Sequence, residues 1–276
     1  MWKSSISERQ RLLSYRSKNR VPVNPQSLLW SRIYISTQEH HGLITTKTML
    51  LPYIKQTHSK ILLICFFISS ALFIIYPSMD IQISSLFYDN GFYLKGTWWE
   101  TLLYKSVKPV LIISLLTVMT LWLVNRYMNK NIWAIDGAKT LYLILVLVIG
   151  SGIIVNVIFK NNFGRARPSD IIEFNGDKKF TPAFVISREC DTNCSFSSGH
   201  GSAAFFTMAL ALLFKHRRKA LVIAFIYGCL VSFSRIVSGR HFFSDNVVSF
   251  FIIAILTDAL YYLYFIDKLK LQRDTE

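Results

Sequence analysis

Six apolar stretches alternate with polar segments along the chain. They cover approximately residues 61–77, 108–125, 140–159, 200–214, 220–237 and 244–265. About 20 apolar residues cross the hydrocarbon core of a bilayer as a helix, so these stretches predict membrane-spanning helices. The fourth stretch is the shortest, and taken alone it is also consistent with a buried core helix of a soluble protein. The pattern therefore predicts an all-α fold, an integral membrane bundle of six helices.

The polar ends of the chain lie outside this predicted bundle. We expect an N-terminal extension over residues 1–58, a six-helix membrane domain over 59–267 and a short cytoplasmic tail over 268–276. The extension is rich in Ser, Arg and Lys and poor in acids, which is the composition of a transit peptide. Our interpretation is instead a cytoplasmic segment that lies partly on the anionic membrane surface, with a solvated tail as the alternative.

The composition agrees with a membrane protein that has a basic surface. Hydrophobic residues make up 52% of the sequence, and 31 Lys and Arg outnumber 16 Asp and Glu. Short cytoplasmic loops hold the excess of Lys and Arg, so the run KHRRK at 215–219 indicates the cytoplasmic side. Both chain ends then share that side, and the loops 78–107, 160–199 and 236–243 face the periplasm or an equivalent outer compartment. Loop 160–199 is itself cationic, which the rule disfavours, so its charge needs a functional reason.

Two of the four cysteines, Cys190 and Cys194, lie close together in the run CDTNC of that outer loop. An oxidising compartment permits a disulfide between them, and two free thiols are the alternative. A zinc site would need two further ligands at suitable spacing, and the sequence offers none nearby. We therefore predict a disulfide and no metal.

Three short segments concentrate charge beside the predicted helices. They are KNNFGRARP at 160–168, SSGH at 197–200 and SRIVSGRHFFSD at 234–245. Charged side chains at membrane depth are costly, and they face a cavity rather than lipid. All three segments fall at the outer ends of predicted helices, so we expect them to converge. Lys160, Arg167 and Arg235 would offer cationic donors there, and guanidinium groups match phosphate oxygens with paired hydrogen bonds.

The same segments contain two candidate catalytic histidines. His241 and Asp245 are four residues apart, which would place them on one helix face with the carboxylate holding one imidazole nitrogen. That arrangement suits an oriented base or nucleophile, although a single histidine near a helix start is more often structural. His200 follows Ser198 and Gly199 at the head of the fourth apolar stretch. Backbone N–H groups and the helix dipole would point there toward an anion.

The order of these residues resembles the type 2 phosphatidic acid phosphatase superfamily of membrane lipid phosphatases. The order is K-x6-R-P, then S-G-H, then S-R-x5-H-x3-D, and the resemblance extends over about residues 60–265. The matching residues are Lys160, Arg167, Pro168, Ser198, Gly199, His200, Ser234, Arg235, His241 and Asp245. Ser197 departs from the pattern, because the family usually has proline before S-G-H. This change loosens the turn and removes no chemical group.

The resemblance implies a metal-independent phosphatase without a cofactor. His241, oriented by Asp245, would attack phosphorus and form a phosphohistidine. His200 would protonate the leaving oxygen and then activate water. The phosphate oxygens would be held by Lys160, Arg167, Arg235, Ser198 and backbone amides near Gly199.

The runs GRARP, FTPAF and CDTNCSFSSG also resemble a bacterial subgroup that removes phosphate from lipid A at the outer face of the inner membrane. This resemblance implies a multi-pass protein of that membrane, with both termini cytoplasmic and a lipid of the outer leaflet as substrate. It implies no nucleic acid partner, and the oligomeric state is not predicted. Arg165 and Arg240 are extra cations that would contact a second phosphate or a sugar headgroup, or lipid headgroups in general.

Other functions stay open. Undecaprenyl pyrophosphate, phosphatidylglycerol phosphate and phosphatidic acid are alternative substrates, because the sequence does not give the shape of the pocket. A transporter or binding protein would use the same cations to hold an anionic lipid without cleaving it. An oriented His–Asp pair with a second histidine exceeds what binding requires, so the sequence favours an enzyme.

Overall fold

The computed structural model describes residues 57–266, and within them every regular element is a helix. The predicted N-terminal extension up to residue 56 and the predicted tail at 268–276 lie outside the described residues. The all-α prediction is therefore confirmed for the described range.

Five helices of this range are long and apolar enough to cross a membrane. Three of them are single elements: α4 (Thr57–Ile75), α6 (Trp98–Tyr127) and α11 (Arg217–Val237). The fourth is one continuous helix made of α7 (Gly137–Leu145), η2 (Val146–Phe159) and α8 (Lys160–Asn162). The fifth is α12 (Phe243–Tyr261), which continues into η5 (Tyr262–Ile266). Each covers most or all of one predicted apolar stretch. Phe67, Ile113 and Ile223 on three of them are more than half exposed, which suits contact with lipid.

The fourth apolar stretch does not form one long helix. It forms α9 (Gly199–Phe205) and α10 (Thr207–Ala211), after which the chain continues in turns to Arg217. The N–H of Ala209 bonds to the carbonyl of Phe206, three residues back instead of four, and this tightens the chain between the two helices. The described range thus holds five long helices and this broken one, where the sequence predicted six.

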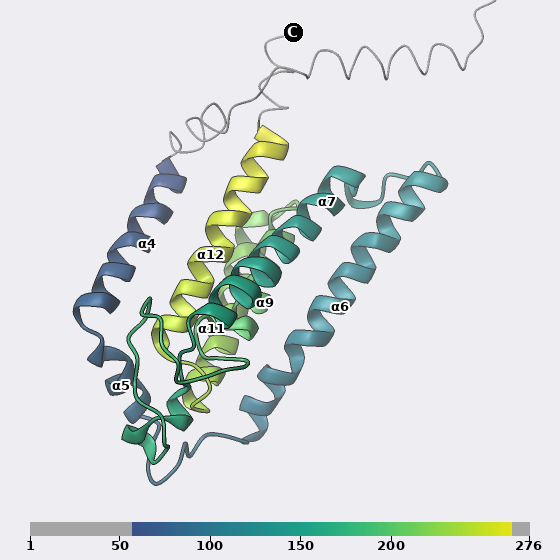
Figure 1. Cartoon of the computed structure of the whole chain (residues 1–276). Helices are drawn as coiled ribbons and strands as arrows, with labels where there is room; N and C mark the ends of the chain where they lie inside the picture. Colours follow the sequence, from purple (N-terminus) through teal and green to yellow (C-terminus); the bar gives the residue numbers. More distant parts are fainter. Residues whose placement is uncertain (1–56, 267–276) are drawn as a thin grey trace, which may run out of the picture. The chain divides into compact units, whose positions relative to one another are not determined.

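α9 packs against α6, α11, α12 and the η2 segment, while α4 packs against α12 (Figure 1). Phe205 and Phe206 pack with Tyr142 and Ile253 in one apolar cluster. Gly228 of α11 permits the close contact, because a Cβ there would lie 2.2 Å from the ring of Phe205. The helix that begins with the S-G-H motif is therefore enclosed by the other helices.

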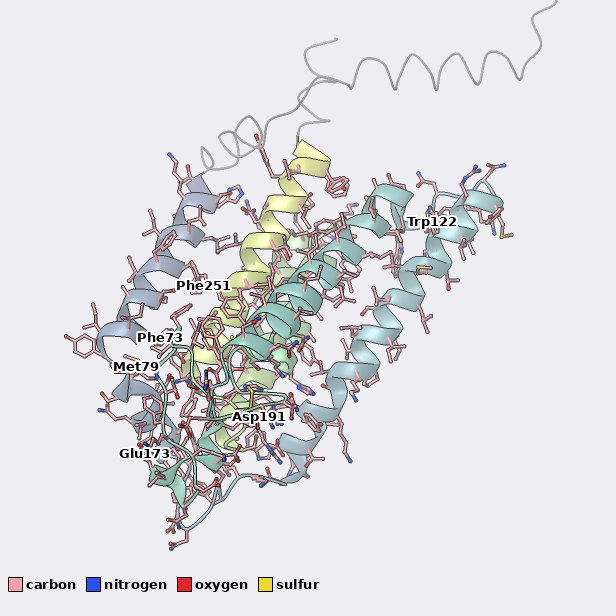
Figure 2. The ribbon with its side chains drawn as sticks, viewed as in Figure 1. Phe73, Met79, Trp122, Glu173, Asp191 and Phe251 are labelled. Carbon is pink, nitrogen blue, oxygen red and sulfur yellow. A yellow bond between two sulfur atoms is a disulfide. The ribbon has the colours of Figure 1, made fainter. Side chains whose placement is uncertain are left out.

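The loops that carry the charged segments pack together at one end of the helices. Short helical elements in the connecting segments of the described range are α5 (Ser78–Ser85), η1 (Ile132–Ala134), η3 (Pro168–Asp170) and η4 (Ile172–Phe174). Phe92, before α6, packs with Phe242, before α12, and with residues of η4 and of the preceding loop. Figure 2 shows Glu173 and Asp191 at this end, whereas Trp122 lies toward the opposite end of α6. This packing gives the three charged segments a common support.

Candidate active site

A cavity of about 440 Å³ opens among the charged segments. Six residues predicted for the site line it: Lys160, Arg167, His200, Arg235, Arg240 and His241. They come from α8 and the loop after it, from α9, and from the end of α11 and the loop that follows. Glu100, Tyr104 and Lys105 of α6 line the same cavity. The structure thus brings distant parts of the sequence to one pocket.

The ring of His241 is held through its Nδ1 atom. Nδ1 lies 2.8 Å from the carbonyl oxygen of Ser195 and 3.5 Å from Oδ2 of Asp245. A carbonyl oxygen can only accept, so Nδ1 carries the proton and the lone pair of the neutral ring is on Nε2. Nε2 is therefore the nitrogen that can act as a base or nucleophile.

The geometry of this pair differs from the predicted one. α12 begins at Phe243, so His241 precedes the helix and does not share a helix face with Asp245. Oδ2 of Asp245 accepts the N–H of Phe242 at 2.9 Å, which turns the carboxylate back toward His241. A capping contact at the helix start, not helical spacing, therefore brings the pair together.

Burial controls the protonation of His241. The residue is 3% exposed, and burial lowers the pKa of its imidazole to about 4, although the hydrogen bond and charge of Asp245 act in the opposite direction. The ring is therefore neutral near pH 7, which is the form that a nucleophile needs.

Arg165 lies beside this pair and outside the cavity. Its side chain is fully buried, and its guanidinium forms ion pairs with Asp245 at 2.5 Å and with Asp80 at 2.8 Å. The ring of Phe242 lies 4.2 Å from the guanidinium carbon. The predicted headgroup contact of Arg165 is therefore wrong, because two carboxylates and an aromatic ring already surround it. Arg165 instead fixes the carboxylate that faces His241.

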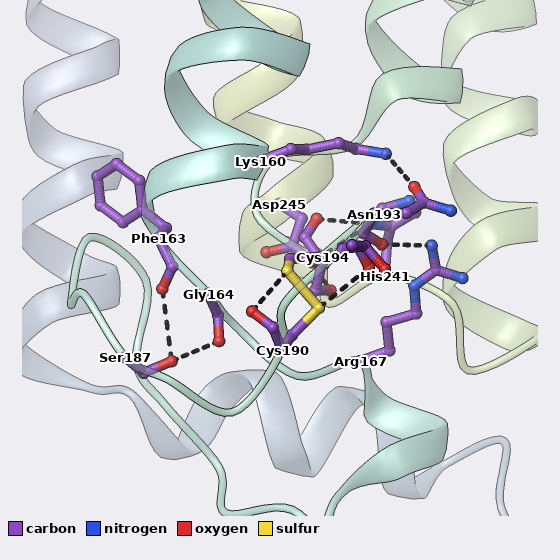
Figure 3. Close-up of a disulfide and its surroundings, with 12 residues drawn as sticks. Lys160, Phe163, Gly164, Arg167, Ser187, Cys190, Asn193, Cys194, His241 and Asp245 are labelled. Atoms are coloured by element: carbon purple, nitrogen blue, oxygen red, sulfur yellow. Dashed lines mark hydrogen bonds and ion pairs between the residues drawn. A yellow bond between two sulfur atoms is a disulfide. The ribbon is translucent and has the colours of Figure 1, made fainter.

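Lys160 and Arg167 are joined through Asn193. Nζ of Lys160 donates to Oδ1 of Asn193 at 2.9 Å, and Nη2 of Arg167 donates to its backbone carbonyl at 2.6 Å (Figure 3). Asn193 lies in the small ring that the disulfide between Cys190 and Cys194 closes. Two predicted phosphate ligands therefore donate hydrogen bonds to one residue of the disulfide loop.

Arg235 is fixed by residues of α6. Its Nη1 donates to Oε1 of Glu100 at 3.0 Å, and its guanidinium carbon lies 4.6 Å from the ring centre of Tyr104. The same ring lies 4.7 Å from the ring of His200. The buried Nε of Arg235 has no acceptor among residues 57–266. It can therefore donate to an oxygen of a bound anion.

The cations of the pocket lie close enough to affect one another. Burial and the positive charge of Arg240 lower the pKa of the Arg167 guanidinium. A bound anion would offset this crowding. The contact predicted between Arg240 and a lipid headgroup stays a prediction.

Ser198 and Gly199 shape the start of α9. Oγ of Ser198 accepts the N–H of Gly201 at 3.1 Å and so caps the helix. At Gly199 a Cβ would lie 3.4 Å from Nζ of Lys160, so glycine lets the ammonium group approach the helix start. Direct contact of either residue with phosphate stays a prediction.

The sequence reasoning missed several residues that hold this site together. They are Asp80, Glu100, Tyr104, Asn193 and Ser195. Glu100 did carry a signal, because an acid beside a predicted membrane helix needs a partner. Ser195 carried none, since its contact with His241 joins residues 46 apart in the sequence.

The sequence matches a known family model in its C-terminal half. Residues 141–270 match the PAP2 superfamily, a range that contains all three charged segments.

Several proteins named lipid A 4′-phosphatase are similar to this chain. The one from Francisella tularensis subsp. novicida (strain U112) is 35% identical over 216 residues, which cover 75% of this chain and 95% of that protein. The one from Rhizobium leguminosarum is 33% identical over 104 residues, which cover 37% of this chain and 45% of that protein. Among solved structures, the first transmembrane PAP2 type phosphatidylglycerolphosphate phosphatase from Bacillus subtilis matches 74% of this chain and 94% of its own, at 19% identity and a TM-score of 0.46.

Proposed function

Because the chain belongs to the PAP2 superfamily, we propose that it is a membrane phosphatase that hydrolyses a phosphate monoester on a lipid headgroup. One observation carries the proposal at the atomic level. The neutral ring of His241, fixed at Nδ1 by Ser195 and Asp245, lines the same cavity as the cationic side chains of Lys160, Arg167 and Arg235. A nucleophile and an anion site therefore share one pocket.

The proposed reaction has two steps. Nε2 of His241 attacks phosphorus, and the bond between phosphorus and the lipid oxygen breaks while His200 protonates that oxygen. The attacking ring becomes positively charged, and Asp245 stabilises it. His200 then removes a proton from water, which attacks the phosphohistidine and releases phosphate.

The cations supply the charge that the transition state requires. Lys160, Arg167 and Arg235 would bind the equatorial oxygens, where negative charge increases as the bonds rearrange. Nε of Arg235, buried and without an acceptor in the described range, supports this role. These groups act without a metal, so we expect hydrolysis to continue in a chelator.

We further propose six crossings, with α9 and α10 as the fourth. The contacts of α9 with α11 and α12 support a path through the membrane beside them. Residues 59–267 then form the membrane domain of a protein of the bacterial inner membrane, and both termini lie in the cytoplasm with KHRRK. The site faces the periplasm, and the disulfide near it supports an oxidising compartment.

The proposed substrate is lipid A, cleaved at its 4′-phosphate. The similar protein from Francisella tularensis subsp. novicida is named lipid A 4′-phosphatase, and the similarity extends over 95% of its length. Arg240 at the pocket would contact the sugar headgroup or a second phosphate.

Phosphate release from purified lipids tests this proposal. The panel holds lipid A, undecaprenyl pyrophosphate, phosphatidylglycerol phosphate and phosphatidic acid, at neutral pH with EDTA present. We expect lipid A to be hydrolysed with the largest kcat/KM. A larger kcat/KM for another lipid would assign that lipid as the substrate in place of lipid A. Binding without hydrolysis of any lipid would favour a transporter or binding protein.

Replacement of the nucleophile tests the mechanism. His241→Ala should abolish turnover, a loss of at least about 10³-fold, and leave the protein folded and inserted in the membrane. His216→Ala is the matched control, because this histidine lies just before α11, away from the catalytic cavity. Undiminished phosphate release by His241→Ala would exclude the nucleophile assignment.

A further inference from the structure

The disulfide between Cys190 and Cys194 has no part in the two chemical steps, yet it lies against the site. The bridge joins cysteines four positions apart, so it closes a ring of five residues. Figure 3 shows this ring beside the side chains of Lys160, Arg167 and His241. Its position suggests a local function, because a bridge across so short a loop restricts the unfolded chain less than a long-range bridge does.

Asn193 is the residue of the ring that touches the predicted phosphate ligands. Its side-chain oxygen accepts from Lys160 and its backbone oxygen accepts from Arg167. Its φ of 52° lies in the left-handed region, which asparagine adopts more readily than most residues. One residue in one backbone conformation therefore presents two acceptors to two cations.

The other side of the ring is anchored to the nucleophile. Cys194 is buried and leads directly into Ser195, whose carbonyl accepts from Nδ1 of His241. The hydroxyl of Ser195 donates to Oδ2 of Asp245 at 2.5 Å. The ring is thus anchored beside His241 through Ser195, and its residue Asn193 presents the two acceptors to Lys160 and Arg167.

We propose that Asn193 is a positioning residue that sets Lys160 and Arg167 for the phosphate oxygens, and that the disulfide keeps Asn193 in place. This inference rests on the proposed function of the same pocket. Asp191, Thr192 and Asn193 are exposed, so the closed ring, and not packing, restricts them. Opening the ring would free both acceptors, and the repulsion between the two cations would then move them out of position.

Reduction by a dithiol such as dithiothreitol opens the ring in the natural protein. The S–S bond breaks, each cysteine sulfur gains a hydrogen, and the dithiol becomes a cyclic disulfide. We expect the KM for the lipid and the inhibition constant of inorganic phosphate to rise about 10-fold, which corresponds to the loss of about 1.4 kcal/mol in binding. kcat should change less, because Ser195 still holds the nucleophile.

Variants separate this effect from a general loss of structure. The double variant Cys190→Ser/Cys194→Ser should show the raised constants without reductant and no further response to it. Asn193→Ala should raise the same constants by a smaller factor, because it removes the acceptor of Lys160 and keeps the backbone carbonyl that accepts from Arg167. Reduction of this variant should raise the constants further, since it frees that carbonyl as well. Thr192→Ala, in the same ring and outside the cavity lining, is the matched control and should behave like the natural protein.

Calorimetric binding of inorganic phosphate gives a readout that does not depend on turnover. Full reduction, verified by thiol labelling, with unchanged phosphate affinity would overturn the inference, and so would equal effects of Asn193→Ala and Thr192→Ala. An oxidised protein that hydrolyses no lipid would contradict the proposed function instead. Calorimetry would then still decide the positioning role of Asn193.

Discussion

Arg165 and Arg167 are two residues apart and carry the same charge, but the structure gives them different surroundings. Arg165 is fully buried between Asp80 and Asp245, whereas Arg167 is half-buried and lines the cavity. A buried guanidinium between two carboxylates contributes to the native state mainly because its removal leaves them without a partner. Arg165 therefore stabilises the structure around the site, whereas Arg167 is placed to bind an anion in the cavity.

We predict that Arg165→Met lowers stability by about 3–5 kcal/mol, because it leaves two buried carboxylates unpaired. Arg167→Met should instead raise KM at least about 10-fold with a thermal midpoint near that of the natural protein. Thermal unfolding in detergent and the kinetics of phosphate release check both effects. The reverse pattern, with a destabilised Arg167 variant and a stable, active Arg165 variant, would contradict this assignment.

The pH dependence of the reaction tests the state of His241. Its neutral form is the proposed nucleophile, and burial lowers its pKa to about 4. As the pH falls from 7, loss of the neutral His241 ring should therefore lower kcat/KM only as the pH approaches that value. The lipid phosphate titrates near pH ~6, and His200, the proposed general acid, must carry a proton, so both titrations are measured separately and divided out. A corrected decline centred near ~6.5, the ordinary value for histidine, would contradict the buried, neutral ring.

Residues of the motifs could be predicted from the sequence, whereas the residues that contact them and hold them in place could not. Lys160 and His241 belong to a spacing pattern that the sequence displays directly. Glu100 and Arg235 are 135 residues apart, and neither local periodicity nor spacing indicates such a pair. The wrong expectation for Arg165 has the same origin, because its partner Asp80 comes from a helix 85 residues away.

At the scale of elements, α9 and α11 depend on a close contact. Gly228 of α11 faces Phe205 of α9, and α9 begins at Gly199, beside His200, the proposed general acid. A side chain at Gly228 would overlap the Phe205 ring and shift the helix that carries His200. Packing between these two helices is therefore coupled to the geometry of the site.

We predict that Gly228→Ala destabilises the protein by about 1–3 kcal/mol through overpacking and also lowers kcat. Gly152→Ala in the η2 segment is the matched control, because a Cβ there would meet only the carbonyl of Leu147 at 3.6 Å. That variant should be neutral or more stable by about 0.5–1 kcal/mol, since alanine favours helix more than glycine does. Equal thermal midpoints for the two variants would show that the contact with Phe205 is unimportant.

Five long helices could be located from apolar length alone, because lipid-facing helices need continuous apolar sequence. The break in the fourth stretch could not be predicted, because no proline or charged residue marks the sequence between α9 and α10. Phe205 and Phe206 at this break pack with residues of other helices, and such contacts between distant parts of the chain are not visible in the local sequence.

At the scale of the whole molecule, the proposed orientation places the cavity lined by His241 and the run KHRRK on opposite sides of the membrane. The prediction is tested in a background with Cys65→Ser and Cys229→Ser. After reduction, a membrane-impermeant thiol reagent should label Cys190, the more exposed cysteine of the bridge, in intact spheroplasts. Lys215→Cys, with the other cysteines also replaced, should be labelled only after lysis. Labelling of the Lys215 variant in intact spheroplasts would reverse the proposed orientation.

The central claim is that the imidazole of His241 bonds covalently to phosphorus during turnover. The most direct measurement uses a lipid with radiolabelled phosphate, a denaturing quench at alkaline pH that preserves phosphohistidine, and mapping of the labelled peptide. We predict label on His241 in the natural protein and in the His216→Ala control, and none in His241→Ala. Active enzyme that carries no label, or carries it on another residue, would contradict the account.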